Sequence, residues 1–245
     1  MIRLASLAAF IAAWYVGSLL AGPELLPAPH AVAGAMLAEL RSGGLAFNLA
    51  VTLLRVAAAF VLAMAVGTAL GIAMGRSTRT DAALEPWLII LLNLPALVVI
   101  VLAYIWAGLN DTAAIAAVAI NKLPSTIVTV REGARAVDVG LEEMAAVYRM
   151  SPVMRLRHVL LPQLAPYIAA AARSGLSLVW KIVLIVELLG RPNGVGFEIG
   201  TAFQLFDVKR LLAYTLAFVA VMLAIEYLAV QPLERRVTRW RPRAA

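Results

Sequence analysis

Six long apolar runs recur along this 245-residue chain, and a run of that length and composition is typical of a helix that crosses a bilayer. Apolar residues make up 63% of the chain and charged residues only 14%, where a soluble domain carries roughly 25%. One soluble core could not bury that much apolar surface. The runs do not alternate as the strands of a membrane barrel do. We therefore expect an all-α membrane protein with a single transmembrane domain over residues 1–245. The expected spans are residues 2–21, 51–74, 86–107, 112–130, 165–189 and 211–230.

The first run has an alternative interpretation, a cleavable signal peptide. Ala21-Gly22-Pro23 is a poor cleavage site, and the run of about 18 residues is close to the length that crosses a bilayer. We favour an uncleaved helix. Two shorter apolar segments, 30–40 and 197–206, are expected as interfacial helices in the outer loops.

Lys and Arg residues outside the spans predict the orientation. With a cytoplasmic N-terminus, thirteen of them lie inside and four outside, and the positive-inside rule selects this topology. Six spans then place both termini in the cytoplasm. We expect the basic C-terminal tail to anchor this topology near anionic lipid, and not to bind nucleic acid. The inside set includes Arg3 and the tail residues Arg235, Arg236, Arg239, Arg241 and Arg243.

Several kinds of chemistry are excluded or disfavoured. The chain has no Cys and only two histidines, His30 and His158, about 130 residues apart, so a metal site is not expected. A membrane-embedded enzyme would need a base beside Ser174 or Ser177, and both histidines fall in loops. There is no Gly-x-x-x-x-Gly-Lys-Ser/Thr motif, so a nucleotide site of that type is not expected in this chain.

The largest cytoplasmic loop, residues 131–164, contains a segment over 138–164 that is too polar to span. Leu141, Met144, Ala145 and Tyr148 recur at helical spacing, and a second apolar stripe follows in residues 153–160. Between them, Ser151-Pro152 is a good N-cap and first-turn pair. The pattern predicts two short helices around a turn, the second ending at Pro162 and Pro166. Such a unit could receive a partner protein, or it could be an ordinary solvated loop.

This segment resembles the EAA motif of ABC importer permeases: Glu-Ala-Ala, three residues, Gly, nine residues, Ile or Val, one residue, Leu-Pro. Glu143 takes the Glu position, Ala145 the second Ala, Val159 the Ile position, and Leu161-Pro162 the end. Two positions depart from the motif, with Met144 for the first Ala and Arg149 for the Gly. A non-Gly residue held at φ > 0 would cost on the order of 1 kcal/mol. The departure puts the turn, or the fit of the ATPase, in question at Arg149. Arg149 could instead make its own contact with an acidic groove.

Other segments are similar to the nitrate/sulfonate/taurine subfamily of these permeases. They lie in order over nearly the whole chain. They are Leu26-Pro27-Ala28-Pro29, residues 52–56 and 71–75, Pro86, Leu94-Pro95, Trp180, Glu187, Gly194-Val195-Gly196, and Glu234-Arg235-Arg236 with Trp240.

The resemblance implies a type I ABC importer permease in the bacterial inner membrane, with six transmembrane helices and a cytoplasmic helix-turn-helix coupling loop. Such a chain is not an enzyme and binds no cofactor, since ATP and Mg belong to a separate ATPase. The implied partners are a second copy in a homodimer, two ATPase subunits and a periplasmic binding protein that delivers a small anionic solute such as a sulfonate, taurine or nitrate. Glu143 would pair with the ATPase or cap its own helix. The resemblance assigns ATPase coupling to Glu143, Met144, Ala145, Tyr148, Arg149, Ser151, Pro152, Val159, Leu161 and Pro162.

Charges inside the expected spans need a reason, because a charge is expensive in lipid. The positive excess suggests a cationic lining for an anion, and internal ion pairing is the alternative. Pro95 and Pro124 are expected to kink their spans. A stand-alone channel or secondary transporter is the alternative function, although such a protein has no use for a docking loop. The candidate pathway residues are Asn121, Lys122, Arg173, Lys181 and Glu187.

Overall fold

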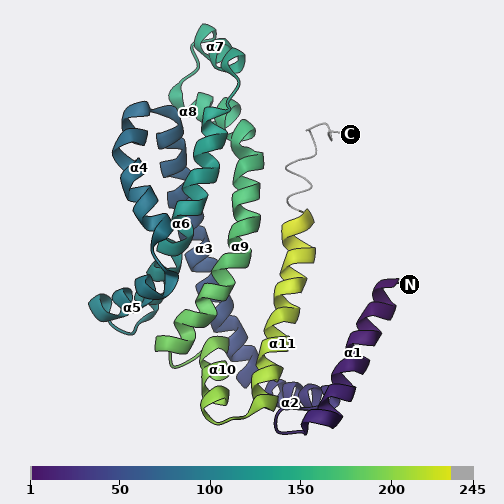
Figure 1. The fold of residues 1–245 in the computed structure, drawn as a ribbon. Coiled ribbons are helices and arrows are strands. Elements are labelled where there is room, and N and C mark those ends of the chain that lie inside the picture. Colours follow the sequence, from purple (N-terminus) through teal and green to yellow (C-terminus); the bar gives the residue numbers. More distant parts are fainter. Residues whose placement is uncertain (1, 233–245) are drawn as a thin grey trace. The chain divides into compact units, whose positions relative to one another are not determined.

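The computed structural model is built of helices throughout residues 2–232, the part of the chain that it describes, with side chains described from residue 5 (Figure 1). The basic tail, with Glu234 and Trp240, and the side chain of Arg3 lie outside the described residues. The helices are α1 (Ile2–Ala21), α2 (Pro29–Arg41), α3 (Gly44–Arg76), α4 (Thr78–Asn93), α5 (Ala96–Ala107), α6 (Asp111–Arg135), α7 (Val139–Val147), α8 (Pro152–Arg155), the π-helical turn η1 (Leu156–Leu160), α9 (Leu161–Gly190), α10 (Val195–Gln204), α11 (Val208–Ile225) and the π-helical turn η2 (Glu226–Val230).

Within the described residues, four helices are long and apolar enough to cross a membrane: α3, α6, the continuous 152–190 helix and the 208–230 helix. A fifth crossing exists if α4 and α5 count as one broken span, and Ala5–Ala21 of α1 is a shorter apolar helix. The expectation of an all-α membrane protein is confirmed, while the structure supports four or five of the six expected spans. The interfacial helices expected over 30–40 and 197–206 correspond to α2 and α10.

The third expected span is broken at Leu94-Pro95, where α4 and α5 meet at 100°. Both residues have extended backbone angles, with ψ of 126° and 133°. Pro95 has no N–H to continue the α4 ladder, and it disfavours helical geometry at the residue before it. The expected kink at Pro95 is confirmed and is sharp enough to separate two helices, whereas α6 continues through Pro124.

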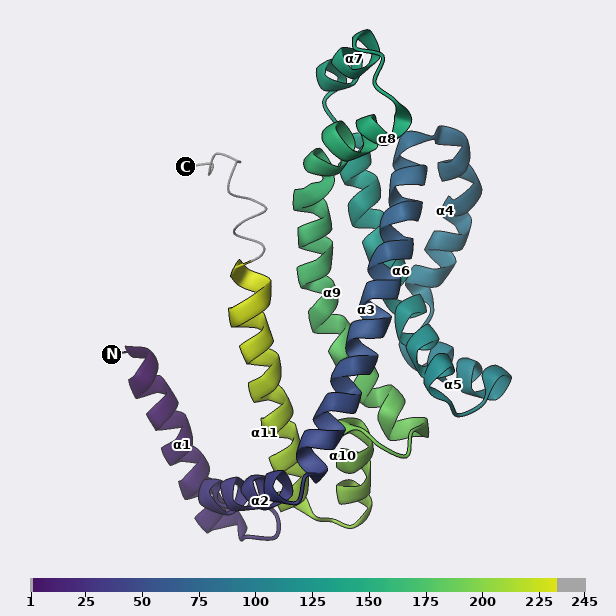
Figure 2. The ribbon, with the colours of Figure 1, turned by 180° about the vertical axis from the view of Figure 1, so that it is seen from behind.

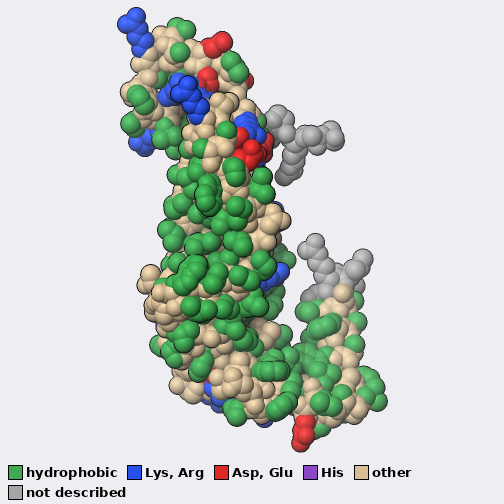
Figure 3. Space-filling view, turned by 60° about the vertical axis from the view of Figure 1, so that its left-hand side comes forward, with side chains coloured by type: hydrophobic (Ala, Val, Ile, Leu, Met, Phe, Trp, Pro, Cys, Tyr) green, Lys and Arg blue, Asp and Glu red, His purple; other side chains and the backbone are tan. Residues whose placement is uncertain are grey.

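The chain divides into two compact units, residues 1–54 with 184–224 and residues 55–183 with 225–245. The second unit has α4 and α5 lying against α6 (Figure 1). Figures 1 and 2 both place α7 at the tip of this unit, beyond α8. In the space-filling view, apolar side chains cover the middle of this unit, and charged side chains gather at the α7 end (Figure 3).

A stripe of small residues on α3 brings it very close to α6. Gly67, Gly71 and Gly75 recur every four residues, and a Cβ on Gly67 would meet Cβ of Thr126 at 2.7 Å. On Gly71 a Cβ would lie 2.9 Å from the Ile127 carbonyl oxygen. Small residues at this spacing let two helix backbones approach without an intervening side-chain layer. The α3–α6 pair is therefore the closely packed framework of this unit.

Ion pairs fasten α6 to its neighbours at both ends. At one end, Asp81 of α4 lies between Arg131 and Arg135, with Asp81 Oδ1–Arg131 Nη1 at 3.2 Å and Asp81 Oδ2–Arg135 Nη2 at 2.5 Å. At the other end, the buried Arg55 of α3 donates from Nε to Asp111 Oδ1 at 2.7 Å. Arg55 thus has the structural role expected of a charge near a span end.

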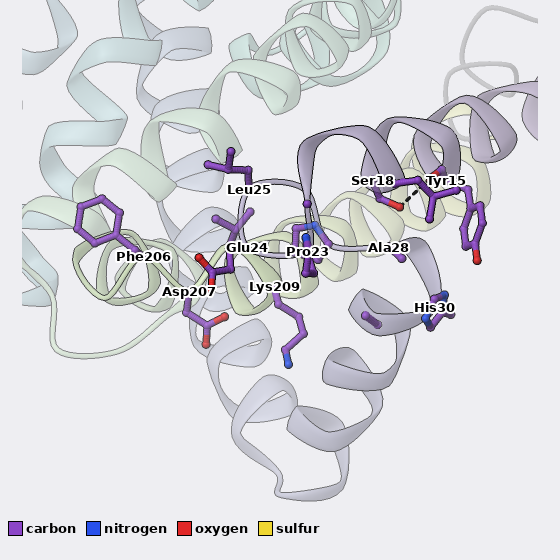
Figure 4. Close-up of a pocket in the computed structure, with 15 residues that line it drawn as sticks. Tyr15, Ser18, Pro23, Glu24, Leu25, Ala28, His30, Phe206, Asp207 and Lys209 are labelled. Atoms are coloured by element: carbon purple, nitrogen blue, oxygen red, sulfur yellow. Dashed lines mark hydrogen bonds between the residues drawn. The ribbon is translucent and has the colours of Figure 1, made fainter.

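The first unit contains a groove of about 920 Å³ formed by α1, the 22–28 loop, α2 and the start of α11 (Figure 4). Apolar side chains such as Leu19 and Leu25 line it together with the charged side chains of Glu24, Asp207 and Lys209. None of the five candidate pathway residues lines this groove.

Candidate functional site

Helix α7, in the loop expected to couple to an ATPase, begins at an Asp N-cap. Asp138 Oδ1 accepts hydrogen bonds from Gly140 N at 2.7 Å and Leu141 N at 3.3 Å. Glu143 lies a full turn further on and is exposed, so the alternative in which it caps its own helix is wrong. Ala145 is only 2% exposed and faces the unit.

The turn after α7 holds Arg149 in a left-handed conformation, with φ of +50°. Arg149 N donates to Ala146 O at 2.9 Å, and Met150 N donates to Ala145 O at 3.0 Å. This pair of bonds is a Schellman C-cap, whose left-handed position is most often Gly. Arg149 stands where the EAA pattern has Gly, so the strain foreseen from the sequence is present in the backbone.

The second helix of the loop starts as the sequence predicts. Ser151 Oγ accepts from Met154 N at 3.3 Å, and Pro152 occupies the first turn. The expectation that this helix ends at Pro162 and Pro166 is wrong, because the helix runs on to Gly190. The π-helical turn η1 ends two residues before Pro162, and local π adjustments of this kind let a membrane helix tolerate a proline.

Apolar side chains left exposed on α7 and α8 form what we call the coupling surface. Val147 and Tyr148 are 79% and 74% exposed at the end of α7. In the second helix of the loop, Val159 at the Ile position of the motif is buried, whereas Leu161 and Pro162 are exposed. An apolar patch on a charged tip marks a protein contact more often than a solvated loop. Its members are Val139, Leu141, Met144, Val147, Tyr148, Val153 and Met154.

Glu142 is the residue of this loop that the sequence analysis missed. It accepts a hydrogen bond at Oε2 from Arg76 Nη2 at 2.6 Å, and it forms a second ion pair with Arg155. The signal in the sequence was its position three residues before Ala145, which puts both on the inward face of α7. The neighbouring Glu143 points to the exposed side, so the two glutamates have different surroundings.

Lys122 is the most deeply buried of the candidate pathway residues on α6, at 1% exposure. Its Nζ donates to Ser125 Oγ at 2.9 Å, and its side chain lies against Gly175 of α9, where a Cβ would fall 2.7 Å from Nζ. Within the described residues no carboxylate pairs with it. Asn121 beside it is half-buried and donates to Ala117 O at 2.8 Å.

Arg173 and Lys181 do not join Lys122. Both are exposed on α9, whereas Gly175 marks the face of α9 that meets Lys122. Arg173 Nε lies 3.7 Å from Glu226 Oε1, and Lys181 Nζ lies 6.0 Å from the centroid of the Trp180 ring. The structure therefore separates the three cations that the sequence suggested might line one path.

Glu187 belongs to a buried network that holds the start of α10. Its two carboxylate oxygens both lie 2.9 Å from Thr52 Oγ1, and the side chain is fully buried. Three successive backbone amides, which a helix start leaves without partners, are bound by side chains here. Asn48 Oδ1 accepts from Gly194 N at 2.7 Å, Thr52 Oγ1 from Val195 N at 2.8 Å, and Glu187 Oε2 from Gly196 N at 2.9 Å.

Contacts with the end of α9 leave no room for a side chain at either glycine of this loop. Gly194 has φ of +108°, and a Cβ there would collide with the Glu187 carboxylate. A Cβ on Gly196 would lie 2.8 Å from Glu187 Cβ. Of the two roles considered for the charges inside the spans, lining a path or bonding internally, this geometry favours internal bonding for Glu187. The carboxylate is bonded to Thr52 and to the loop before α10, and not to Lys181. No group of His, Asp and Glu among the described residues could hold a metal ion.

Comparison with known proteins places these features in a family. Residues 63–239 match the model for the binding-protein-dependent transport system inner membrane component. A putative aliphatic sulfonates transport permease of Bacillus subtilis is 30% identical over 236 residues, 96% of this chain and 85% of the relative. The taurine transport system permease of Escherichia coli is 28% identical, covering 93% of this chain and 84% of the relative. The nitrate import permease of Synechococcus elongatus is 26% identical, covering 80% of this chain and 74% of the relative.

Solved structures share the fold. An inward-facing structure of the MetNI methionine ABC transporter covers 81% of this chain and 96% of its own, with a TM-score of 0.62 at 20% identity. In such systems ATP is hydrolysed by a separate ATPase subunit, and a binding protein supplies the solute. A stand-alone channel or secondary transporter is thereby set aside. The chain belongs to the family of inner-membrane permease components of binding-protein-dependent ABC transporters.

Proposed function

We propose that two copies of this permease form a pathway for a small anionic solute, and that the coupling surface of each copy receives one ATPase subunit. The observation that carries the docking role is the exposed apolar set at the end of α7, beside a turn built around Arg149. Both termini would lie in the cytoplasm, the side on which α7 and α8 meet the ATPase. Movement of the docked helices would then open the pathway to alternate sides.

The coupling surface suits a groove on a partner. Val147 and Tyr148 supply apolar area, and the short α7 is held at both ends by the Asp138 cap and the Schellman turn. A preorganised helix loses little conformational freedom on binding. Glu143 is exposed on the same helix and would pair with a basic residue of the ATPase.

Capture of the ATPase by the purified permease tests this role. We expect Val147→Asp to abolish capture, because it places a charge in an apolar contact. Phe206→Asp is the matched control, since Phe206 is an exposed apolar residue in the turn before α11, and it should capture normally. Equal capture by both variants would contradict the docking role, and a folded wild-type chain that captures no ATPase would contradict the function as a whole.

An anionic solute is favoured by the buried ammonium of Lys122. Within the described residues this cation has a hydroxyl partner and no carboxylate, and an uncompensated charge in a membrane marks a substrate path more often than a packing role. Permeases named for sulfonates, taurine, nitrate and bicarbonate are among the relatives. Arg173, Lys181 and Asn121 would contribute only where helix movement or the second copy brings them to the path.

Uptake into proteoliposomes tests the anion pathway, with methanesulfonate, taurine and nitrate as the probes. Lys122→Met keeps the length of the side chain and removes its charge, so we expect uptake to be lost while ATPase capture is retained. Ser125→Ala removes the hydroxyl partner and leaves the charge, and it should transport. Normal uptake by Lys122→Met would refute the role of Lys122.

The dimer and the orientation are open to direct measurement. The chain contains no Cys, so one introduced near either terminus is a unique label. We expect a membrane-impermeant thiol reagent to reach both positions only from the cytoplasmic side. Native mass spectrometry should give two permease chains per complex.

A further inference from the structure

We propose that Glu142 is the positioning residue through which movement of α7 is passed to α3, an inference that rests on the proposed docking of an ATPase at the coupling surface. Glu142 accepts from Arg76, the last residue of α3, at 2.6 Å. It also pairs with Arg155, the last residue of α8. One carboxylate therefore joins three helices.

The surroundings of Glu142 make this tie strong. The side chain of Glu142 is 11% exposed, whereas those of Arg76 and Arg155 are 34% and 41% exposed, so the carboxylate is the shielded end of both pairs. Removing one partner of a shielded pair leaves the other charge uncompensated. A cavity of about 290 Å³ adjoins the tie. The residues that line it are Arg76, Glu142, Met150, Pro152, Arg155, Leu156 and Leu160.

Other contacts of α7 lead elsewhere in the unit. Asp138 N, at the cap of α7, donates to Gln163 Oε1 of α9 at 2.9 Å. Among the described hydrogen bonds and ion pairs of α7, those of Glu142 are the ones that reach α3. Without Glu142, α7 would still be held to α9 but would have no polar tie to α3.

From α3 the movement can pass to α6 through the close contact between the two helix backbones. The glycine stripe at 67, 71 and 75 leaves no side-chain layer that could slide between the two backbones. Lys122 lies on α6. Glu142 is thus the first of two links that join the ATPase side of the molecule to the buried cation.

The experiment uses the permease–ATPase complex in nanodiscs. Because the chain has no Cys, Thr129→Cys on α6 gives a single site for a bimane reporter. The signal is the fluorescence change on adding ATP and vanadate. We expect Glu142→Gln to reduce this change by about fivefold or more, the lower end of ordinary coupling factors, while ATPase capture stays at the wild-type level.

Asp81→Asn is a closely matched control. Asp81 is also a carboxylate between two arginines, at 15% exposure, and it joins α4 to α6 without involving α7. It should leave the fluorescence change intact. Arg76→Gln should reduce the change, and the Glu142→Gln/Arg76→Gln double variant should be no worse than Glu142→Gln alone. Arg76→Lys should keep at least about half of the signal, because it retains a positive charge opposite Glu142 and leaves the pair with Arg155 intact.

The other possible results contradict either the link through Glu142 or the proposed function. Glu142→Gln behaving like Asp81→Asn refutes the link. Loss of ATPase capture in Glu142→Gln also refutes it, because the residue would then serve docking. If Glu142→Gln does not fold, Arg76→Gln and Arg76→Lys decide, and an equal loss of signal in both refutes the link. No change in the otherwise wild-type complex would contradict the proposed function itself.

Discussion

Replacing Arg149 by Gly should stabilise the turn after the coupling helix. Arg149 holds φ of +50° in a Schellman cap. A non-Gly residue in the left-handed region costs roughly 1–2 kcal/mol, and the extra freedom of Gly in the open state returns roughly 0.4–1 kcal/mol of that gain. The net gain is about 0.8 kcal/mol, which corresponds to about a fourfold smaller opening equilibrium.

Hydrogen exchange at the turn measures this gain. Met150 N donates to Ala145 O at 3.0 Å, and the turn must open for that amide to exchange. We expect exchange of Met150 to slow by about fourfold in Arg149→Gly, since each 1.4 kcal/mol is a factor of ten. Arg149→Ala is the control, because it removes the guanidinium and keeps the left-handed strain, so its exchange should not slow.

Two outcomes would refute this reasoning. Equal slowing in the Ala and Gly variants would mean that the guanidinium, and not the backbone, destabilises the turn. Faster exchange in the Gly variant would mean that the strain is absent. ATPase capture separates a further possibility, because a contact between Arg149 and an acidic groove would weaken capture equally in both variants.

Two further predictions concern the packing of each unit. Gly71→Ala should destabilise the detergent-solubilised permease by about 1–3 kcal/mol in thermal unfolding, because its Cβ would lie 2.9 Å from the Ile127 carbonyl oxygen. Gly34→Ala on α2 is the control and should be neutral or stabilising, because nothing lies within 4 Å of its Cβ. Equal effects of the two substitutions would contradict the close packing of α3 on α6. Thr52→Val keeps the shape of the side chain and leaves Val195 N without its acceptor at 2.8 Å. We expect the free energy of unfolding to fall by about 1–3 kcal/mol and the amide hydrogens at the start of α10 to exchange faster. Unchanged amide exchange there would refute the role of this network.

The helical framework followed from the sequence because apolar length is a local property. The runs predicted α3, α6, α9 and α11, and the observed α3 begins at Gly44, seven residues before the predicted start at Val51. Asn48 accounts for part of that difference, because its amide donates to Gly44 O at 3.0 Å and so lets a polar residue continue the helix. The bend at Pro95 was foreseen, but its 100° depends on how α5 packs against α6.

The positions of the two helices and the turn in the 138–164 loop were predicted from the sequence, but the side-chain contacts of the loop were not. The caps at Ser151 and the strain at Arg149 are properties of single residues and their neighbours, so the sequence carries them. The roles of Glu142 and Glu143 depend on which side of α7 meets α3, and two adjacent glutamates give no sign of that. The continuation of the helix past Pro162 was not foreseen, because the π-helical turn that precedes it is an adjustment of the backbone and not a pattern of residues.

The separation of the charges changes the case for an anion. The sequence offered three cations against Glu187, a set in which internal neutralisation was a fair alternative. In the structure the Glu187 carboxylate is bound by Thr52 and Gly196, so its acceptors already serve the start of α10. Lys122 lies beside one hydroxyl, with Gly175 leaving room for its side chain. A buried ammonium without a carboxylate is costly in a membrane, and a passing anion would lower that cost while it is bound. Among the charges inside the spans, Lys122 is therefore the one that supports an anionic solute, and Lys122→Met tests it directly.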